Sequence, residues 1–81
     1  MSNFEPNISD IMIGEYSHKF RIIPLLKELN KWQFQIDDLP PTSRFVIEMN
    51  DDQQWVQVSG QDIIEENVIN EVGSSVRKLY F

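Results

Sequence analysis

The 81-residue sequence contains no cysteine, three glycines and seven basic residues. Without cysteine the chain can form neither a disulfide framework nor a thiolate metal site, so the usual covalent support of a small secreted domain is missing. No stretch approaches the roughly 18 consecutive apolar residues that span a bilayer, and the N-terminus MSNFEPNISD has no basic region followed by an apolar one. We therefore expect a soluble, cytoplasmic protein with no membrane contact and no signal peptide.

Basic residues are also few relative to acidic ones, seven against thirteen, which gives a formal net charge of −6. This excess disfavours nucleic acid and anionic membranes as direct partners, and it favours another protein with a basic surface. A net charge of this size also serves simply to keep a small domain soluble. The length and the 41% hydrophobic content suffice for one core, so we expect a single domain over residues 1–81.

The stretch RFVIEMNDDQQWVQVS, residues 44–59, predicts a β-hairpin. Two runs rich in β-branched and aromatic residues flank the turn-forming residues 50–53. A turn centred on residues 51 and 52 places Ile47 opposite Val56, and a four-residue loop gives the same register. Alternation then puts Trp55 and Glu48 on the mixed face of the hairpin. The other face is predicted to be core and is apolar: Phe45, Ile47, Met49, Val56 and Val58.

The N-terminal part predicts an irregular arm followed by a second hairpin. Residues 1–7 have no periodicity, whereas apolar and aromatic residues alternate with polar ones over 16–23, as in a strand. Gly14, as the first residue of a two-residue loop, favours a type II′ turn that joins 10–13 to this strand. A short helical turn over 8–13 is the alternative.

Between the hairpins the sequence predicts a short helix and a strand. Pro24 suits the first position of a two-turn helix over 24–30, whose leucines fall on one face. Lys31 to Asp37 alternates with period two and predicts a strand. The following connector contains Pro40 and Pro41, which cannot donate hydrogen bonds to a sheet.

The C-terminal segment predicts an amphipathic helix over 61–72. Ser59 and Asp62 resemble a capping box, and apolar residues recur every four positions from Ile64 to Tyr80. Gly73 costs about 1 kcal/mol relative to alanine inside a helix. Residues 73–80 therefore either continue the helix or form a terminal strand over 76–80.

Together these elements predict an α+β fold in a single small domain. A mainly antiparallel sheet of about four strands, near 16–23, 31–37, 44–49 and 54–59, carries the short helix 24–30 and the C-terminal helix on one face.

Few residues suggest catalysis. His18 is the one histidine, so a zinc site would need several carboxylates as well. No serine lies in a nucleophile-elbow or P-loop context, and the pairs Asp37-Asp38 and Asp51-Asp52 lack the spaced ligands and the glycine of a calcium loop. We therefore expect no enzymatic activity, no metal and no cofactor.

The two tryptophans offer the clearest functional hint. Trp32 fits the core face of its strand, whereas Trp55 is either covered by one of the terminal segments or exposed as an interface anchor within a polar rim. We expect a non-catalytic protein-binding module, an acidic inhibitor, immunity protein or adaptor that docks on a basic protein surface. The residues expected to bind the partner are Trp55, Glu48, Asp51 and Asp52.

A structural role is the alternative function. In a subunit of a larger assembly, such as a phage or secretion particle, apolar terminal segments would bury against neighbouring copies. The residues expected to form such contacts are Phe4, Leu79, Tyr80 and Phe81.

Overall fold

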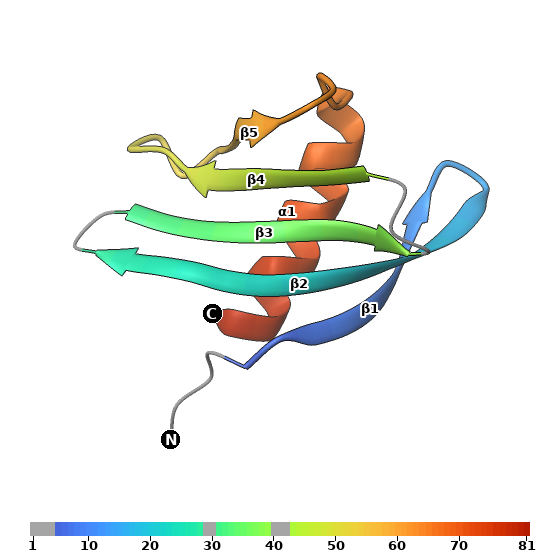
Figure 1. The fold of residues 1–81 in the computed structure, drawn as a ribbon, viewed down its shortest axis with the longest axis horizontal. Coiled ribbons are helices and arrows are strands. Elements are labelled where there is room, and N and C mark those ends of the chain that lie inside the picture. Colours follow the sequence, from blue (N-terminus) through green and yellow to red (C-terminus); the bar gives the residue numbers. More distant parts are fainter. Residues whose placement is uncertain (1–4, 29–30, 40–42) are drawn as a thin grey trace.

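Five strands and one helix follow one another in the structure, a computed structural model that describes residues 5–28, 31–39 and 43–81. The elements are β1 (Asn7–Ile13), β2 (Tyr16–Glu28), β3 (Lys31–Leu39), β4 (Ser43–Met49), β5 (Trp55–Gly60) and α1 (Glu66–Tyr80). Each strand pairs antiparallel with the next, so the sheet is a meander in the order β1-β2-β3-β4-β5 (Figure 1). The α+β class is confirmed, but the sheet has five strands rather than about four.

The additional strand is β1, which pairs with β2 from Asn7 to Ile13. Gly14 has φ 64°, the sign that a type II′ turn requires at its first central residue. The predicted hairpin is confirmed, and the alternative helical turn over 8–13 is wrong. The predicted arm 1–7 lies partly outside the described residues, and Glu5 and Pro6 precede the strand without regular structure.

The predicted short helix 24–30 is wrong, because β2 continues through Pro24 to Glu28; residues 29 and 30 lie outside the described part of the chain. The β2–β3 register shifts between Pro24 and Leu26, and a β-bulge is a position where a strand tolerates proline. Pairing with β3 supplies backbone hydrogen bonds along the whole segment. An isolated two-turn helix is marginal by comparison.

Helix α1 begins at Glu66, not at residue 61, and continues to Tyr80. The predicted capping box does not form: residue 65 is the N-cap and makes no side-chain capping bond, while residues 61–65 connect β5 to the helix. Gly73 does not interrupt the helix, so the alternative of a terminal strand over 76–80 is also wrong.

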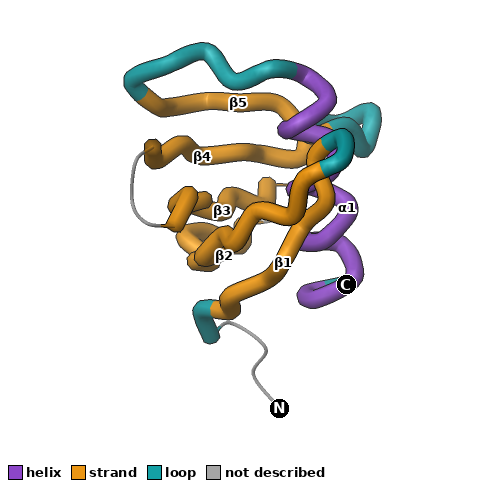
Figure 2. Tube along the Cα trace, turned by 90° about the vertical axis from the view of Figure 1, so that its right-hand side faces the viewer, coloured by secondary structure: helices purple, strands orange, loops and turns teal. Residues whose placement is uncertain are grey.

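The hydrophobic core lies between α1 and one face of the sheet. Figure 1 shows the helix crossing behind the strands, and Figure 2 shows it on one side of the sheet alone. Among the described residues no element covers the other face, which we call the open face. The buried apolar residues come from four strands and the helix: Ile11, Phe20, Ile22, Phe34, Ile36, Phe45, Ile47, Ile69, Val72 and Val76.

The predicted register of the β4–β5 hairpin is wrong by one residue next to the turn, and by two residues beyond the irregularity between Val46 and Ile47. Met49 pairs with Trp55, so the connection consists of the five residues 50–54, and Gln53 has φ 61°. A one-residue shift exchanges the faces of a strand. Trp55 therefore faces α1, and the predicted core positions Val56 and Val58 are exposed instead. On β4 the predicted core residues are confirmed as buried for Phe45 and Ile47, and Met49 is half-buried.

Candidate functional site

The tip of the β4–β5 hairpin is a loop that Asn50 organises. Its side-chain Oδ1 accepts hydrogen bonds from the backbone N–H of Asp52 and of Gln54, each at 2.9 Å. The N–H of Gln53 donates to the Asn50 carbonyl at 3.0 Å. Asp51 and Asp52 are both exposed, and within the described residues neither makes an ion pair. The loop therefore holds two carboxylates in solvent at one end of the sheet.

Trp55 lies under the C-terminal helix, one of the two arrangements that the sequence left open. Its ring packs edge-on against Phe34, with centroids 5.9 Å apart, and lies 6.5 Å from the ring of Phe81. It also lies directly against the backbone of Gly73. Trp55 is half-buried in these contacts and does not project from the surface as a free anchor.

Glu48 lies on the opposite side of the sheet from Trp55. It points to the open face, where Gln33 Nε2 donates a hydrogen bond of 2.8 Å to Glu48 Oε1. The structure therefore separates the four residues that the sequence singled out. Asp51 and Asp52 remain together at the hairpin tip, while Trp55 and Glu48 lie on different faces of the sheet.

Beside β5 lies a hollow of about 820 Å³, which we call the β5 hollow. It is bounded by residues 53–60, by residues 61–64 of the connection to the helix and by one flank of α1. Figure 2 shows the connection leaving the end of β5 and passing over the sheet edge to the start of the helix. Trp55, Ile64 and Ile69 line the hollow, and Ile63, 98% exposed, stands on its rim.

Gln57 holds the wall of the β5 hollow together. Its Nε2 donates to the carbonyl of Asp62 at 2.7 Å, and its Oε1 accepts from the N–H of Ile64 at 2.8 Å. One amide thus satisfies two backbone groups of the connection 61–65. Sequence reasoning missed this residue because a glutamine in an alternating strand is typical of a solvent-facing position.

Charges are distributed unevenly around the β5 hollow. Asp62 and Glu66 line the end nearest the start of the helix. At the other end, Arg77 Nη2 donates to the carbonyl of Gln53 at 3.3 Å, and the exposed residues Asp51 and Asp52 immediately precede Gln53 in the chain. The lining therefore combines the apolar side chains of Trp55, Ile64 and Ile69 with carboxylates at one end and, at the other, Arg77 beside the loop that carries Asp51 and Asp52.

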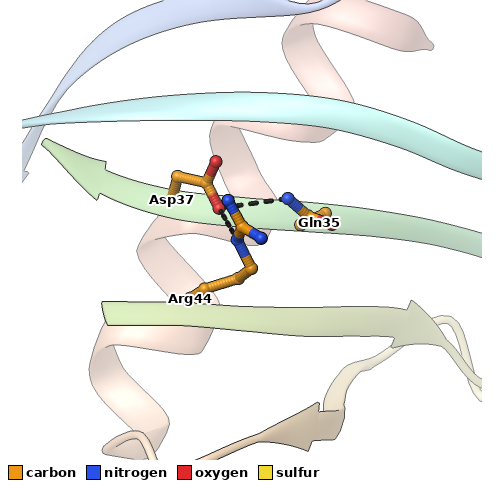
Figure 3. A network of polar contacts seen from close by, with 3 residues as sticks. All are labelled: Gln35, Asp37 and Arg44. Carbon is orange, nitrogen blue, oxygen red and sulfur yellow. Dashed lines mark hydrogen bonds and ion pairs between the residues drawn. The ribbon is translucent and has the colours of Figure 1, made fainter. Parts of the chain in front are cut away.

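The open face carries a buried carboxylate (Figure 3). Asp37 is 3% exposed, and its Oδ1 accepts hydrogen bonds from Arg44 Nε at 2.9 Å and from Gln35 Nε2 at 3.2 Å. The Arg44 side chain itself remains 67% exposed. Because successive residues of a strand point to opposite faces, Asp38 faces the helix side. These two aspartates therefore do not form a paired carboxylate site.

A smaller hollow, of about 360 Å³, adjoins the β5 hollow, with which it shares Ile63 and Ile64, and includes His18 and Glu65. The His18 ring lies 6.1 Å from that of Phe20, as in a packed structural histidine. Within residues 5–28, 31–39 and 43–81, no group of three or more metal-ligating side chains is close enough to hold a metal ion. Nor does any helix in these ranges have the length and apolarity needed to cross a bilayer.

Comparisons of the chain with protein-family models, with curated proteins and with solved structures find no significant match.

Proposed function

We propose that this chain is a non-catalytic protein-binding module of the inhibitor, immunity-protein or adaptor kind, and that it docks on a basic protein surface through the β5 hollow. The observation that carries the proposal is a hollow in which the apolar side chains of Trp55, Ile64 and Ile69 lie close to exposed carboxylates. Asp62 and Glu66 lie at one end, and Asp51 and Asp52 lie beyond the other.

The arrangement has the anatomy of an interface. A binding patch typically has an apolar centre that is desolvated in the complex and a polar rim that remains wet. Ile63 is an aliphatic side chain with almost no contacts in this structure, so burial against a partner would gain its full hydrophobic contribution of about 1.5–3 kcal/mol. The rim carboxylates and the net charge of −6 would attract a basic partner and speed its association.

The roles of the residues proposed from the sequence change accordingly. Asp51 and Asp52 keep the role of steering charges. Trp55 lines the β5 hollow, and Ile63 takes its place as the projecting anchor. Glu48 lies on the open face and is outside this surface.

Affinity capture with the full chain tests this function. The tagged wild type, the rim variant Asp62→Asn/Glu66→Gln and the control Glu71→Gln are each exposed to extract of the source cell, and retained proteins are identified by mass spectrometry. Glu71 is a suitable control because it is exposed on α1 but does not line the hollow.

We expect the wild type and the control to retain the same basic protein, with retention falling as salt concentration rises. The rim variant should retain much less of it. Equal retention by all three proteins, or a retained partner with an acidic surface, would contradict docking through this hollow.

A structural subunit remains the second candidate, and the end of α1 favours it. Leu79 and Phe81 are exposed there, although the Phe81 ring makes an edge-on contact with Trp32 at 4.5 Å. Phe4 lies outside the described residues. Sedimentation velocity over a range of concentrations separates the two candidates. A subunit should assemble as concentration rises and lose that assembly in Leu79→Ser, whereas a binding module should remain monomeric.

A further inference from the structure

The two edge strands of the sheet differ in how well they are protected. An edge strand exposes backbone donors and acceptors that can pair with another chain, unless a bulge, charges or a covering segment prevent it. On β5 the register shifts opposite Val46 and Ile47, and the connection 61–65, held by Gln57, passes over that edge (Figure 2). The outer edge of strand β5 is therefore protected from pairing with another chain.

Strand β1 has no such protection. Its register with β2 runs without a shift from Asn7 to Ile13, it contains no proline, and Asp10 is its one charged residue. Within the described part of the chain no element runs along its outer edge (Figures 1 and 2). The strand is thus a regular, unpaired edge of the sheet.

The geometry of the β1–β2 hairpin identifies the free backbone groups. Ile13 and Tyr16 close the two-residue turn, so they form a hydrogen-bonded pair. Because the backbone groups of alternate residues point in opposite directions along an antiparallel strand, residues 7, 9, 11 and 13 bond to β2. The N–H and C=O groups that point outward belong to Ile8, Asp10 and Met12.

The side chains of the same three residues project on the open face. Ile8 is 57% exposed and Met12 is 54% exposed, and Asp10 lies exposed between them. Asp10 makes no ion pair with any described residue, although Lys19 is its neighbour on β2. The outer edge of the sheet therefore presents the pattern apolar, acidic, apolar on one face.

We propose that β1 accepts a sixth strand from a basic protein partner, with apolar, Lys or Arg, and apolar side chains opposite Ile8, Asp10 and Met12. This inference rests on the proposed function, because it assigns the basic partner a second point of attachment. Backbone pairing supplies affinity in such strand addition, and alternate side chains supply specificity. A second copy of this chain fits less well, because aligning Ile8 with Met12 of the copy places the two Asp10 carboxylates opposite each other.

Two acetylated and amidated peptides test the proposal with the full chain. The peptide TVTKTVT offers the complementary pattern, and TVTETVT replaces the central lysine with glutamate. A third peptide is TVTKTVT with N-methyl groups on the valines and the lysine, which removes the donors that would pair with β1. Binding is measured by titration calorimetry, and hydrogen exchange of each backbone amide is followed by NMR.

We expect the wild type to prefer TVTKTVT over TVTETVT by about tenfold, and Asp10→Lys to reverse that preference. The N-methylated peptide should not bind. Exchange at the amides of Ile8, Asp10 and Met12 should slow when TVTKTVT is bound, a change that binding elsewhere on the protein cannot produce. Glu71→Lys is the matched control, because it makes the same charge change at an exposed residue that lies in neither β1 nor the lining of the β5 hollow, and it should leave the preference unaltered.

The outcomes separate this inference from the proposed function. Strand addition is wrong if TVTKTVT binds without protecting the three amides, or if its N-methylated form binds equally well. Either result leaves the proposed docking of this chain on a basic protein surface unaffected. If none of the peptides binds at millimolar concentration, strand addition is wrong, and the proposed function is decided by the capture experiment. Loss of partner retention in the rim variant together with amide protection by TVTKTVT supports both.

Discussion

The indole of Trp55 lies directly on the backbone of Gly73. A Cβ atom added to this glycine would overlap the five-membered ring and come within 2.7 Å of Nε1. The helix has φ in the ordinary helical range there, so the glycine is needed for space and not for an unusual backbone conformation. Because Gly73 has no side chain, α1 can approach β5 closely, and Trp55 is half-buried between them. The same contact explains why a residue that weakens helices lies in the middle of one.

Gly73→Ala is therefore expected to destabilise the protein by about 1–3 kcal/mol, as overpacking of a core does, although alanine is the better helix former by about 1 kcal/mol. Urea denaturation measures the change. Ser74→Ala is the control: this neighbouring residue is exposed, so the substitution should be neutral or slightly stabilising. A gain of stability in Gly73→Ala would show that the tryptophan ring moves aside without cost.

The β4–β5 hairpin gives a second prediction. Ile47→Ala should cost about 2–4 kcal/mol, because Ile47 is fully buried and truncation leaves a cavity. Val58→Ala should cost less than about 1 kcal/mol, because Val58 is exposed at the irregular part of β5. Chemical denaturation of both variants checks the register. Similar losses for the two would indicate that Val58 contributes to the core after all.

Period-two alternation of apolar residues predicted four of the strands and the buried positions of β4, because that signal depends on local pattern alone. The register of β5 depends instead on the number of residues in the turn. Asn50 uses its side chain to close a five-residue connection, and a sequence rich in turn formers does not distinguish this from an even-numbered loop. One extra residue then placed Trp55 under the helix.

The helix predicted after Pro24 was wrong for a different reason. The local preference of this segment for helix is weak, and it pairs instead with the adjacent strand β3, from Glu28 opposite Lys31 to Pro24 opposite Phe34, a stabilisation that helix propensity does not include. The β5 hollow could not be predicted from a local pattern either. Its walls come from β5, from Ile63 and its neighbours, and from one flank of α1, and their proximity follows from the packing of the helix. The two aspartates at the hairpin tip were found because turn chemistry selects them locally.

Gln53 gives a third prediction, because it is the one described non-glycine residue with positive φ. The left-handed conformation costs an ordinary L-residue roughly 1–2 kcal/mol, whereas glycine adopts it freely. Gln53→Gly should therefore stabilise the protein by about 0.5–1 kcal/mol, measured by thermal or urea denaturation. Gln54→Gly is the matched control and should be destabilising, since that position has no positive φ to relieve. Equal effects at the two positions would contradict a strained Gln53.

Burial of Trp55 gives a fourth prediction. Trp55→Ala should cost about 2–4 kcal/mol of stability, a little less than full burial of the ring would imply. With Trp32 replaced by phenylalanine, the emission of Trp55 should be blue-shifted and protected from iodide. Red-shifted emission that iodide quenches freely would restore Trp55 as an exposed anchor.

The last prediction distinguishes steering from anchoring on the partner that the capture experiment identifies. Asp51→Asn/Asp52→Asn removes two exposed charges from the tip, and Ile63→Ala removes an exposed aliphatic group from the rim of the β5 hollow. Neither change should alter the free energy of unfolding by more than about 0.5 kcal/mol, because both sites are exposed. Any effect on binding can then be read as a change in the interface itself.

Rim charges act mainly on the association rate, whereas a desolvated apolar group acts on dissociation. The double asparagine variant should associate more slowly and show a weaker dependence on ionic strength, with its dissociation rate nearly unchanged. Ile63→Ala should instead dissociate about tenfold faster at an unaltered association rate, a loss of about 1.4 kcal/mol. Surface plasmon resonance at several salt concentrations measures both rates. If Ile63→Ala matches the wild type in both rates, the partner does not bury this residue and the anchor lies elsewhere on the β5 hollow. If the double asparagine variant associates as fast as the wild type, the hairpin tip is not part of the interface.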